Sequence, residues 1–396
     1  MKWLNRERLT VYPKIFLALY ACFGAVLIIS AAVSGNGLTD FLGRPLGADF
    51  SHYWVASSMA KAGDPAAVYN FQEFLAAQEA FFKVKFPLPW LYPPTYLLLV
   101  LPLALLPYLP ALAVWLVVTL GAYLAVVRRI APHPLTPWLA LAFPGTFQNF
   151  FHGQNGFMSA ALLGGGLLLL NRSPLTGGFL LGLLSYKTHL WVLVPLALVA
   201  GRRWRALMAA VAAALAMVLA SWLVLGQQVW IAYWHNISLP MKLLEEGFLP
   251  MDKMVTIFSA LLQFRTGLAT ALVVQTVIMI AVGGAIFRLW HRETAFAVQA
   301  SGLVLGILLF TPYCFSYDLM LLALPLAWLG WEGYTKKWLP GEQLFLALGW
   351  TMPFIAIIGG QLKVQLAPLI LVALFLLVWR RSRITAAAIW KPTKPY

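Results

Sequence analysis

The chain has 396 residues, of which 61% are hydrophobic and only 10% are charged. A typical soluble domain carries about 25% charged residues, and a surface with much less charge would not keep the protein in solution. The hydrophobic residues also form long uninterrupted runs, which is typical of helices that lie in lipid. Composition therefore excludes a soluble protein and predicts an all-α polytopic membrane protein.

The net charge of +15 is explained by membrane topology. Cytoplasmic loops of membrane proteins collect Lys and Arg. One arrangement of the apolar segments places most of the 28 basic residues on one side with few of the 13 acidic residues. The charges on the other side then nearly cancel, so the positive charge does not indicate a nucleic-acid-binding patch.

The apolar segments predict about 12 transmembrane helices. A spanning helix needs about 20 apolar residues, with a lower limit of about 17. In chain order, the candidate spans are 15–34, 110–127, 135–150, 157–170, 175–186, 189–200, 206–225, 266–287, 295–310, 318–333, 343–359 and 364–379. This even number places both termini in the cytoplasm, while the short spans at 175–186 and 189–200 remain open to merging or extension.

The apolar segment Thr95–Leu109 does not fit as a further span. It would move Arg128 and Arg129 to the outer side, and it contains Pro102 and Pro107, which break or kink helices. We expect a re-entrant or juxtamembrane helix that returns to the outer face and is covered by other parts of the protein.

Two long segments lie on the outer side, at 35–94 and 226–265. The first is predicted to contain amphipathic juxtamembrane helices near 52–62 and 71–82, separated by Gly63-Asp64-Pro65. Function tends to gather on loops that a rigid scaffold holds in place. We therefore interpret residues 1–396 as a single membrane domain with these two segments as its working parts.

Charged residues at membrane boundaries are expensive, so each suggests a function. Asp49 follows the first span, where it can cap the next helix or act as a general base, and the two roles can coexist. Lys187 stands alone between two apolar helices; a bound phosphate would offset its charge, as would a lipid headgroup reached by snorkelling. Asp318 is another acid with few local partners, which fits acceptor binding, orientation of a base, or helix capping.

Polar side chains with ambiguous roles stand near these charges. Tyr92 precedes two prolines, where it can bind sugar or phosphate or serve as an interfacial aromatic anchor. Gln154 and Asn155 are bracketed by Gly153 and Gly156; their amides suit sugar hydroxyls, although a polar tight turn explains the same residues.

The motifs together resemble family 87 (GT87, DUF2029) of the GT-C glycosyltransferases, which includes mycobacterial mannosyltransferases of the phosphatidylinositol mannoside pathway. Any one of them is weak evidence, but their order and spacing are specific. They are Gly47-Ala48-Asp49-Phe50, Gly63-Asp64-Pro65 with Tyr69, Tyr92-Pro93-Pro94, Leu101-Pro102-Leu103, Gly153-Gln154-Asn155, Gly177-Gly178 leading to Lys187, Arg202-Arg203-Trp204, Thr311-Pro312 and Tyr317-Asp318.

The resemblance implies a GT-C-like helical bundle with an extracytoplasmic active site in a bacterial inner membrane. It also implies a polyprenyl-phosphate-sugar donor, most often carrying mannose, a lipid or glycan acceptor, and inversion at the anomeric carbon with Asp49 as the base.

On this hypothesis Lys187, Tyr92 and His189 bind the donor phosphate, and sugar or acceptor contacts come from His52, Gln154, Asn155, Tyr317 and Asp318. The leaving phosphate is already anionic and needs charge stabilisation more than protonation, so we expect neither a metal nor a cofactor. The alternative is a transporter or flippase for lipid-linked sugars, which would show two related halves with interrupted helices; no such symmetry is visible in the sequence.

Overall fold

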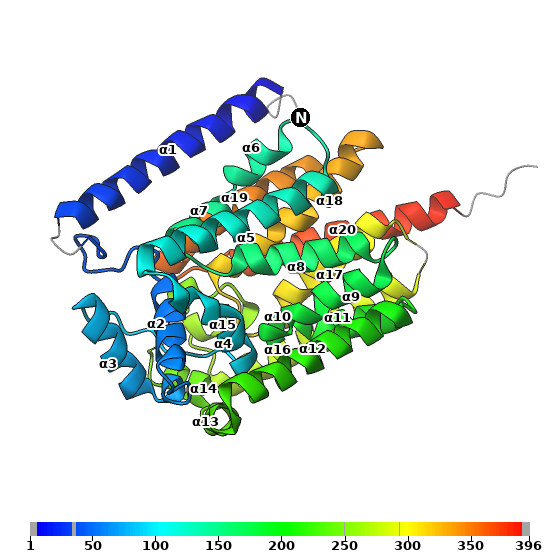
Figure 1. The fold of residues 1–396 in the computed structure, drawn as a ribbon. Helices are drawn as coiled ribbons and strands as arrows, with labels where there is room; N and C mark the ends of the chain where they lie inside the picture. Colours follow the sequence, from blue (N-terminus) through cyan, green and yellow to red (C-terminus); the bar gives the residue numbers. More distant parts are fainter. Residues whose placement is uncertain (1–5, 34–36, 249, 293, 390–396) are drawn as a thin grey trace, which may run out of the picture.

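The structure, a computed structural model, describes residues 6–33, 37–248, 250–292 and 294–389 of the chain. Throughout these residues the regular secondary structure is helical, and the only β-type pairings there are two isolated bridges, Thr39–Pro45 and Met254–Phe315. The all-α class predicted from composition is therefore confirmed for the part of the chain that is described (Figure 1).

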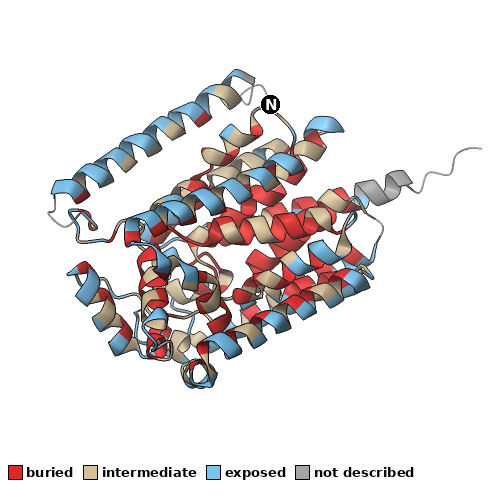
Figure 2. Cartoon of the chain, in the orientation of Figure 1, coloured by how far each residue is buried: buried red, intermediate tan, exposed pale blue. Residues whose placement is uncertain are grey.

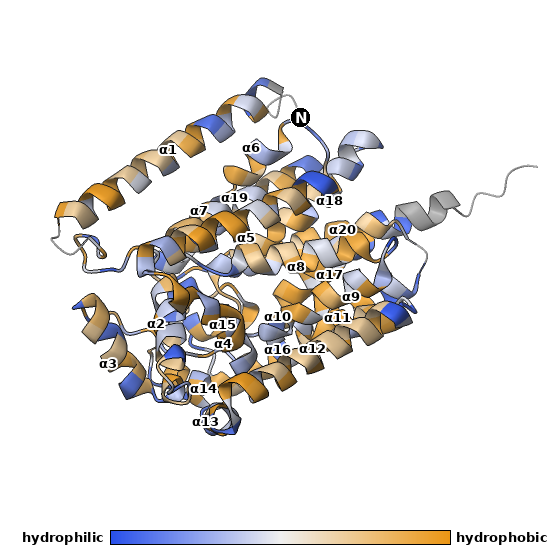
Figure 3. Cartoon of the chain, viewed as in Figure 1, coloured by the Kyte–Doolittle hydropathy of each residue, from blue (hydrophilic) through white to orange (hydrophobic). Residues whose placement is uncertain are grey.

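Within the described residues, five helices are long and apolar enough to cross a membrane. They are α1 (Arg6–Val33), α5 (Tyr108–Ile130), α12 (Trp204–Leu225), α16 (Leu268–His291) and α19 (Glu342–Gln361). The hydropathy colouring of Figure 3 shows α1 and α5 as largely hydrophobic, and only 6–33% of each of the five spanning windows is buried inside the protein. Apolar surfaces of this kind, left uncovered by protein, are suited to lipid contact.

The rest of the bundle consists of shorter helices and one further long helix. They are α6 (Thr136–Leu141), α7 (Pro144–His152), α8 (Gly156–Leu169), α9 (Pro174–Leu183), η3 (Leu184–Tyr186), α10 (Thr188–Trp191), α11 (Leu193–Ala200), α17 (Phe296–Phe310), η5 (Ser316–Leu322), α18 (Ala323–Thr335) and α20 (Ala367–Ile389). Every predicted span overlaps one or more helices, but most are shorter than a full crossing, so the count of 12 spans stays a prediction.

One predicted span, 135–150, is two helices rather than one. The helix α6 ends at Leu141, and Pro144 opens α7 at a position where its missing N–H is harmless. The same proline cannot continue a helix from before it without breaking the hydrogen-bond ladder, which explains why the apolar run is interrupted here.

Short helices gather at one end of the molecule, where the two long segments that the sequence predicts to be outer lie (Figure 1). They are α2 (Phe50–Lys61), η1 (Ala67–Tyr69), α3 (Phe71–Phe82), α4 (Pro94–Val100), η2 (Leu101–Leu105), α13 (Gln227–His235), α14 (Leu239–Glu245), η4 (Met251–Lys253) and α15 (Ile257–Gln263). The helices predicted near 52–62 and 71–82 are confirmed as α2 and α3, and the expected break between them contains Gly63 at a φ of 99°.

The segment predicted to be re-entrant forms α4 and η2, which together cover Pro94–Leu105. At 1.5–2.0 Å per residue these 12 residues extend about 20 Å, whereas the hydrocarbon core is about 30 Å thick. The pair packs against α12 and α2. Its length and its cover of protein are what a juxtamembrane helix requires.

Helix α17 forms the centre of the bundle. Every residue from Val298 to Leu309 is buried, and the helix contacts α16, α18, α20 and α11. A helix that is apolar on all sides and covered by neighbours belongs to the core rather than to the lipid boundary. Figure 2 shows this buried core between more exposed outer helices.

Close helix packing depends on glycine where α9 meets α12. A Cβ added to Gly178 would lie 2.2 Å from the carbonyl oxygen of Ala206, and one added to Gly182 would lie 2.3 Å from that of Ala210. Small residues four apart let two membrane helices approach closely. These two glycines therefore fix the position of α9, the helix that leads into Lys187.

A buried ion pair closes the opposite end of the bundle. The guanidinium of Arg381 on α20 donates to both carboxylate oxygens of Glu342 on α19, at 2.7 and 2.6 Å. The side chain of Glu342 is fully buried. Its Oε2 atom also accepts from the backbone N–H of Leu339. Paired geometry of this kind satisfies both charges.

Candidate active site

The carboxylate of Asp49 lies at the start of α2 but does not cap that helix. Its Oδ2 accepts a hydrogen bond of 2.8 Å from Nε2 of Gln154, while Oδ1 has no partner among the described residues. The residue is half-buried. The capping explanation therefore does not account for Asp49, and one of its oxygens is free to accept a proton.

A tight turn brings Gln154 to Asp49. Helix α7 ends at His152, and Gly153 follows it with a φ of 62°, the left-handed conformation that favours glycine. A Cβ at this position would lie 2.5 Å from Cβ of Phe50 on α2. The turn is also held by Trp115, whose ring N–H donates to the carbonyl of Gly153 at 3.0 Å.

Two tyrosines continue the hydrogen bonding beyond Gln154. The hydroxyl of Tyr53 donates to Oε1 of Gln154 at 2.8 Å and lies 3.2 Å from the hydroxyl of Tyr92. Tyr92 in turn accepts from Nδ2 of Asn155 at 3.0 Å. Tyr92 is thus part of a polar network rather than only an anchor at the membrane surface.

The network ends at a buried ion pair that corrects one expectation. Lys187 is not alone: its Nζ lies 2.5 Å from Oδ1 of Asp318 and donates to Oδ1 of Asn155 at 3.0 Å. The two charged side chains are 3% and 2% exposed. The Lys187 ammonium also sits 5.3 Å from the ring centre of Tyr317, a cation–π distance. Sequence alone missed the pair because 131 residues separate its members.

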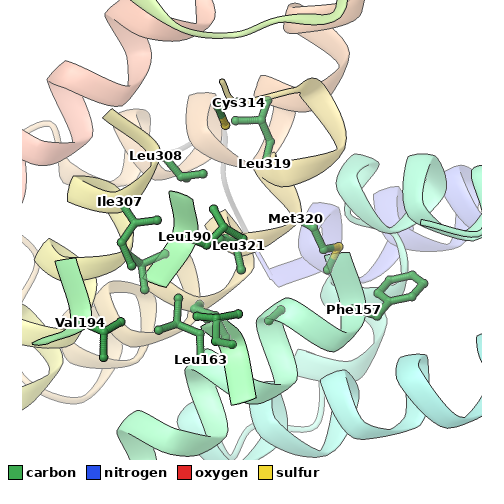
Figure 4. Close-up of a cluster of buried hydrophobic side chains, with 14 of the residues drawn as sticks. Phe157, Leu163, Leu190, Val194, Ile307, Leu308, Cys314, Leu319, Met320 and Leu321 are labelled. Carbon is green, nitrogen blue, oxygen red and sulfur yellow. The ribbon is translucent and has the colours of Figure 1, made fainter. Parts of the chain in front are cut away.

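Apolar packing explains why Lys187 and Asp318 meet. Leu190 follows the lysine on α10, and Leu319 and Leu321 follow the aspartate on η5. Figure 4 shows these side chains in one cluster with Leu163 of α8 and Ile307 of α17. All five are buried, so the hydrophobic effect holds the two chain segments together and places their charges side by side.

The loop before Asp318 is held by the second outer segment. Met254 and Phe315 form a β-bridge, and the hydroxyl of Thr256 donates to the carbonyl of Pro312 at 3.0 Å. The second carboxylate oxygen of Asp318 accepts from the backbone N–H of Phe315 at 3.1 Å. Residues 254–256 therefore help to keep Asp318 in place.

Two histidines lie beside the network with unused nitrogens. The buried atoms Nδ1 of His52 and Nε2 of His189 have no hydrogen-bond partner among the described residues. The ring of His52 stacks near that of Tyr92, at 6.3 Å between centres. Burial lowers the pKa of His52 to about 4, against the opposing effect of Asp49, so the ring is neutral near pH 7 and able to accept or donate.

The family model of glycosyltransferase family 87 matches residues 90–312, more than half of the chain. The chain belongs to glycosyltransferase family 87. No curated protein and no solved structure matches it. Membership of family 87 makes the protein a membrane glycosyltransferase, which acts on a sugar donor and an acceptor.

The family 87 match covers part of the predicted site. Tyr92, Gln154, Asn155, Lys187 and His189 lie inside the matched range. The remaining predicted residues lie outside it; they are Asp49, His52, Tyr317 and Asp318. The structure nevertheless connects both groups, since Asp49 and Asp318 bond directly to residues within the match.

Several aromatic residues of the candidate site were not predicted from sequence. Tyr53 bonds to Gln154, and Trp90 and Tyr96 stack with ring centres 5.7 Å apart, while Tyr96 stacks on Tyr186 at 4.9 Å. A buried tyrosine in an amphipathic helix has the same pattern as an ordinary core residue. Only the position of Tyr53 four residues after Asp49 hints that both lie on one helix face.

A groove runs beside the short helices α2 and η2. It has a volume of about 480 Å³ and is lined by the end of α2, by η2 and by the end of α12, including Lys61, Leu101, Leu105 and Leu225. Most of the lining is apolar. The site residues named above are not among those that line it.

Proposed function

We propose that this protein transfers mannose from a polyprenyl-phosphate-mannose donor to a lipid or glycan acceptor at the extracytoplasmic face, with inversion at the anomeric carbon. The observation that carries the proposal is the continuous hydrogen-bonded network that joins Asp49 to Lys187. Family 87 supplies the reaction class. The network supplies one carboxylate and one ammonium in a single site, which is what transfer from a phosphate leaving group requires.

Asp49 is the general base. Its Oδ1 is without a partner among the described residues, and its other oxygen is held by Gln154. As the acceptor hydroxyl oxygen forms a bond to the anomeric carbon, its proton passes to this carboxylate. A base fixed on one side and open on the other suits that step.

Lys187 stabilises the leaving group. The bond between the anomeric carbon and the phosphate oxygen breaks with its electron pair on that oxygen, so polyprenyl phosphate departs with an added negative charge. Two N–H groups of Lys187 are occupied by Asn155 and Asp318, and the third has no hydrogen-bond partner among the described residues. A lysine ammonium has three donors, so this third N–H is available to the phosphate, with Tyr92 and His189 alongside.

Residues around the network contact the sugar and acceptor. The unused Nδ1 of His52 and the second amide N–H groups of Gln154 and Asn155, each of which uses one N–H in the network, are suited to hydroxyl groups. The ring of Tyr317 offers an apolar face, and Asp318 acts there by holding Lys187.

The groove beside α2, η2 and α12 suits the polyprenyl tail. Its walls are mostly apolar, it lies against the juxtamembrane helix, and it carries one cation, Lys61, at its edge. A long isoprenoid chain gains by burying apolar surface in such a groove. The reacting end of the donor then extends from the groove toward the site.

The distribution of basic residues supports the orientation. Arg128 and Arg129 end α5, Arg288 lies in the last turn of α16, and Arg202 and Arg203 join α11 to α12. These connections lie at the end of the bundle away from α2, α3 and α13 (Figures 1 and 3). With basic residues inside, this distribution supports a site that faces out of the cytoplasm, termini in the cytoplasm and the proposed 12-span topology in a bacterial inner membrane.

Replacing Asp49 tests the proposal. In lipid nanodiscs containing EDTA, the wild type is expected to transfer radiolabelled mannose from polyprenyl-phosphate-mannose to a membrane-lipid acceptor. Asp49→Asn removes the base and should lower kcat by roughly 10²–10⁴-fold without changing the thermal unfolding midpoint. Asp64→Asn is the control, because Asp64 is an exposed aspartate of the same segment, and its carboxylate accepts from the backbone N–H of Ala67 at 3.2 Å.

Near-normal turnover of Asp49→Asn would remove Asp49 from the base role. Activity that is absent in EDTA and returns with Mg²⁺ or Mn²⁺ would contradict the metal-free scheme. A wild type that transfers another hexose but not mannose would correct the sugar and leave the reaction class intact.

A further inference from the structure

The hydrogen bonds between Lys187 and Asp49 have a direction that the two charges dictate. An ammonium can only donate, so the Asn155 oxygen faces Lys187 and its NH₂ group faces Tyr92. A carboxylate can only accept, so the Gln154 NH₂ group faces Asp49 and its oxygen accepts from Tyr53. The orientation of both amides is therefore fixed by chemistry.

The middle of the network follows from its ends. Tyr53 has one hydroxyl hydrogen, and it is donated to Gln154. In the 3.2 Å contact between the tyrosines, Tyr92 must then be the donor. Every bond consequently donates in the same sense, from Lys187 through Asn155, Tyr92, Tyr53 and Gln154 to Asp49. Hydrogen bonds arranged in one direction polarise and strengthen one another.

Burial protects the centre of this network. Tyr53 and Asn155 are 0% exposed and Gln154 is 2% exposed, so water does not compete for their hydrogen bonds. The ring of Tyr53 packs edge-on against those of Tyr96 and Trp115. Burial also raises the pKa of the Tyr53 phenol well above its usual value, which keeps the hydroxyl protonated as a donor.

Lys187 and Asp49, at the two ends of the network, each keep hydrogen-bonding capacity that no described residue uses. The hydrogen of the Tyr53 hydroxyl is already donated. This hydroxyl accepts from Tyr92, donates to Gln154 and is fully buried. It therefore has no hydrogen left to offer a substrate. Any effect of this hydroxyl on the reaction must pass through its neighbours.

We propose that Tyr53 is a positioning residue that holds Gln154, and through it the Asp49 carboxylate, in line with the charge of Lys187. The inference rests on the proposed transferase function. Removing the hydroxyl takes away one of the two donors of the Gln154 oxygen and leaves it the backbone N–H of Asn155 at 3.1 Å, which loosens the hold of the amide on Asp49. It also frees the Tyr92 hydrogen, which can then turn toward the donor phosphate.

The test is Tyr53→Phe in full-length protein in nanodiscs, assayed for mannose transfer. We expect kcat to fall roughly 10- to 100-fold, the loss expected when a buried hydrogen-bonding group is left without its partner, while the KM for the donor does not rise. Tyr123→Phe is the matched control. Tyr123 is also fully buried, but its hydroxyl only approaches the carbonyl of Ala140 at 3.4 Å, and this variant should keep wild-type kcat.

A double variant separates positioning from general damage. Gln154→Ala breaks the same connection from its other side, so Tyr53→Phe combined with Gln154→Ala should be no more than about threefold slower than Gln154→Ala alone. Losses that multiply, or a kcat for Tyr53→Phe within twofold of wild type, would overturn the positioning role and leave the transferase intact. A folded wild type that transfers no sugar would overturn the proposed function, and the positioning role with it.

Discussion

Lys187 and Asp318 are charged residues inside an apolar bundle, where charges are least expected. Taking either ion out of water alone costs several kcal/mol, yet both are almost completely buried. Each is tolerated because the other is present, with Asn155 and the Phe315 amide satisfying further hydrogen bonds. The aspartate therefore acts as an internal counter-ion for the lysine, which under the proposed function keeps the cation ready for phosphate.

Neutral replacements should reveal this dependence. Lys187→Met and Asp318→Leu each leave one uncompensated buried charge, so each alone should destabilise the protein by about 3–5 kcal/mol. The double variant removes both charges and should recover most of that stability, while transfer activity stays abolished because the cation is gone. Thermal unfolding in detergent, followed alongside mannose transfer, measures both effects.

The outcome that would contradict this account is a double variant less stable than either single one. In that case the two residues would contribute independently rather than as a pair. The exposed Lys85 offers a control, since Lys85→Met removes a lysine from the first outer segment without leaving a buried charge.

Individual site residues were predictable to the extent that charge made them conspicuous. Asp49, Lys187 and Asp318 stand out because each interrupts or borders an apolar run. The partner of Lys187 was not predictable, because the pairing depends on tertiary packing around Leu190 and Leu319. Tyr53 was missed because a buried aromatic residue on a helix usually belongs to a core.

At the level of elements, α9 links packing to the site. Its glycines set how closely it approaches α12, and its end continues through η3 into Lys187. A shift of α9 therefore displaces the lysine. Substitutions at Gly178 of α9 should therefore affect activity as well as stability, although this glycine is not next to Lys187 in the sequence.

Gly178→Ala is expected to show that sensitivity. The added Cβ would lie 2.2 Å from a backbone oxygen of α12, so the helices must separate, with a loss of stability of about 1–3 kcal/mol and lowered transfer activity. Gly284→Ala is the matched control on α16, because nothing lies within 4 Å of its added Cβ and alanine favours helices.

The unfolding temperature and kcat of the two variants test whether close packing of α9 on α12 is required. Equal behaviour of Gly178→Ala and Gly284→Ala would show that the close approach of α9 and α12 is not required.

The sequence predicted which segments form helices better than it predicted where each helix ends. Apolar runs identified every bundle helix, and Gly63-Asp64-Pro65 correctly separated α2 from α3. The break at Ala142 and Phe143 was missed because both residues suit an apolar helix, and Pro144 marks only the start of α7. Helix lengths depend on how neighbours pack, which hydrophobicity alone does not encode.

For the molecule as a whole, the proposed orientation places the short helices outside the cytoplasm. In a variant with Cys22 and Cys314 replaced by serine and alanine, Lys85→Cys should react with a membrane-impermeant maleimide in intact spheroplasts. Arg172→Cys, at the turn between α8 and α9, should react only after permeabilisation, because the positive-inside rule places it in the cytoplasm. Both side chains are exposed, so accessibility of the residue itself is not limiting.

The reverse labelling pattern would invert the topology and place the site in the cytoplasm. Labelling of both positions in intact spheroplasts would instead show that α8 and the preceding helices do not cross as proposed.

The clasp between Arg381 and Glu342 has a consequence for handling the gene. Arg381 lies in α20, and its partner Glu342 is the first residue of α19. A reading frame that stops before codon 381 would strand a carboxylate in the interior with no cation to meet it. Purification tags and reporter fusions should therefore follow α20, so that the Arg381–Glu342 ion pair is kept.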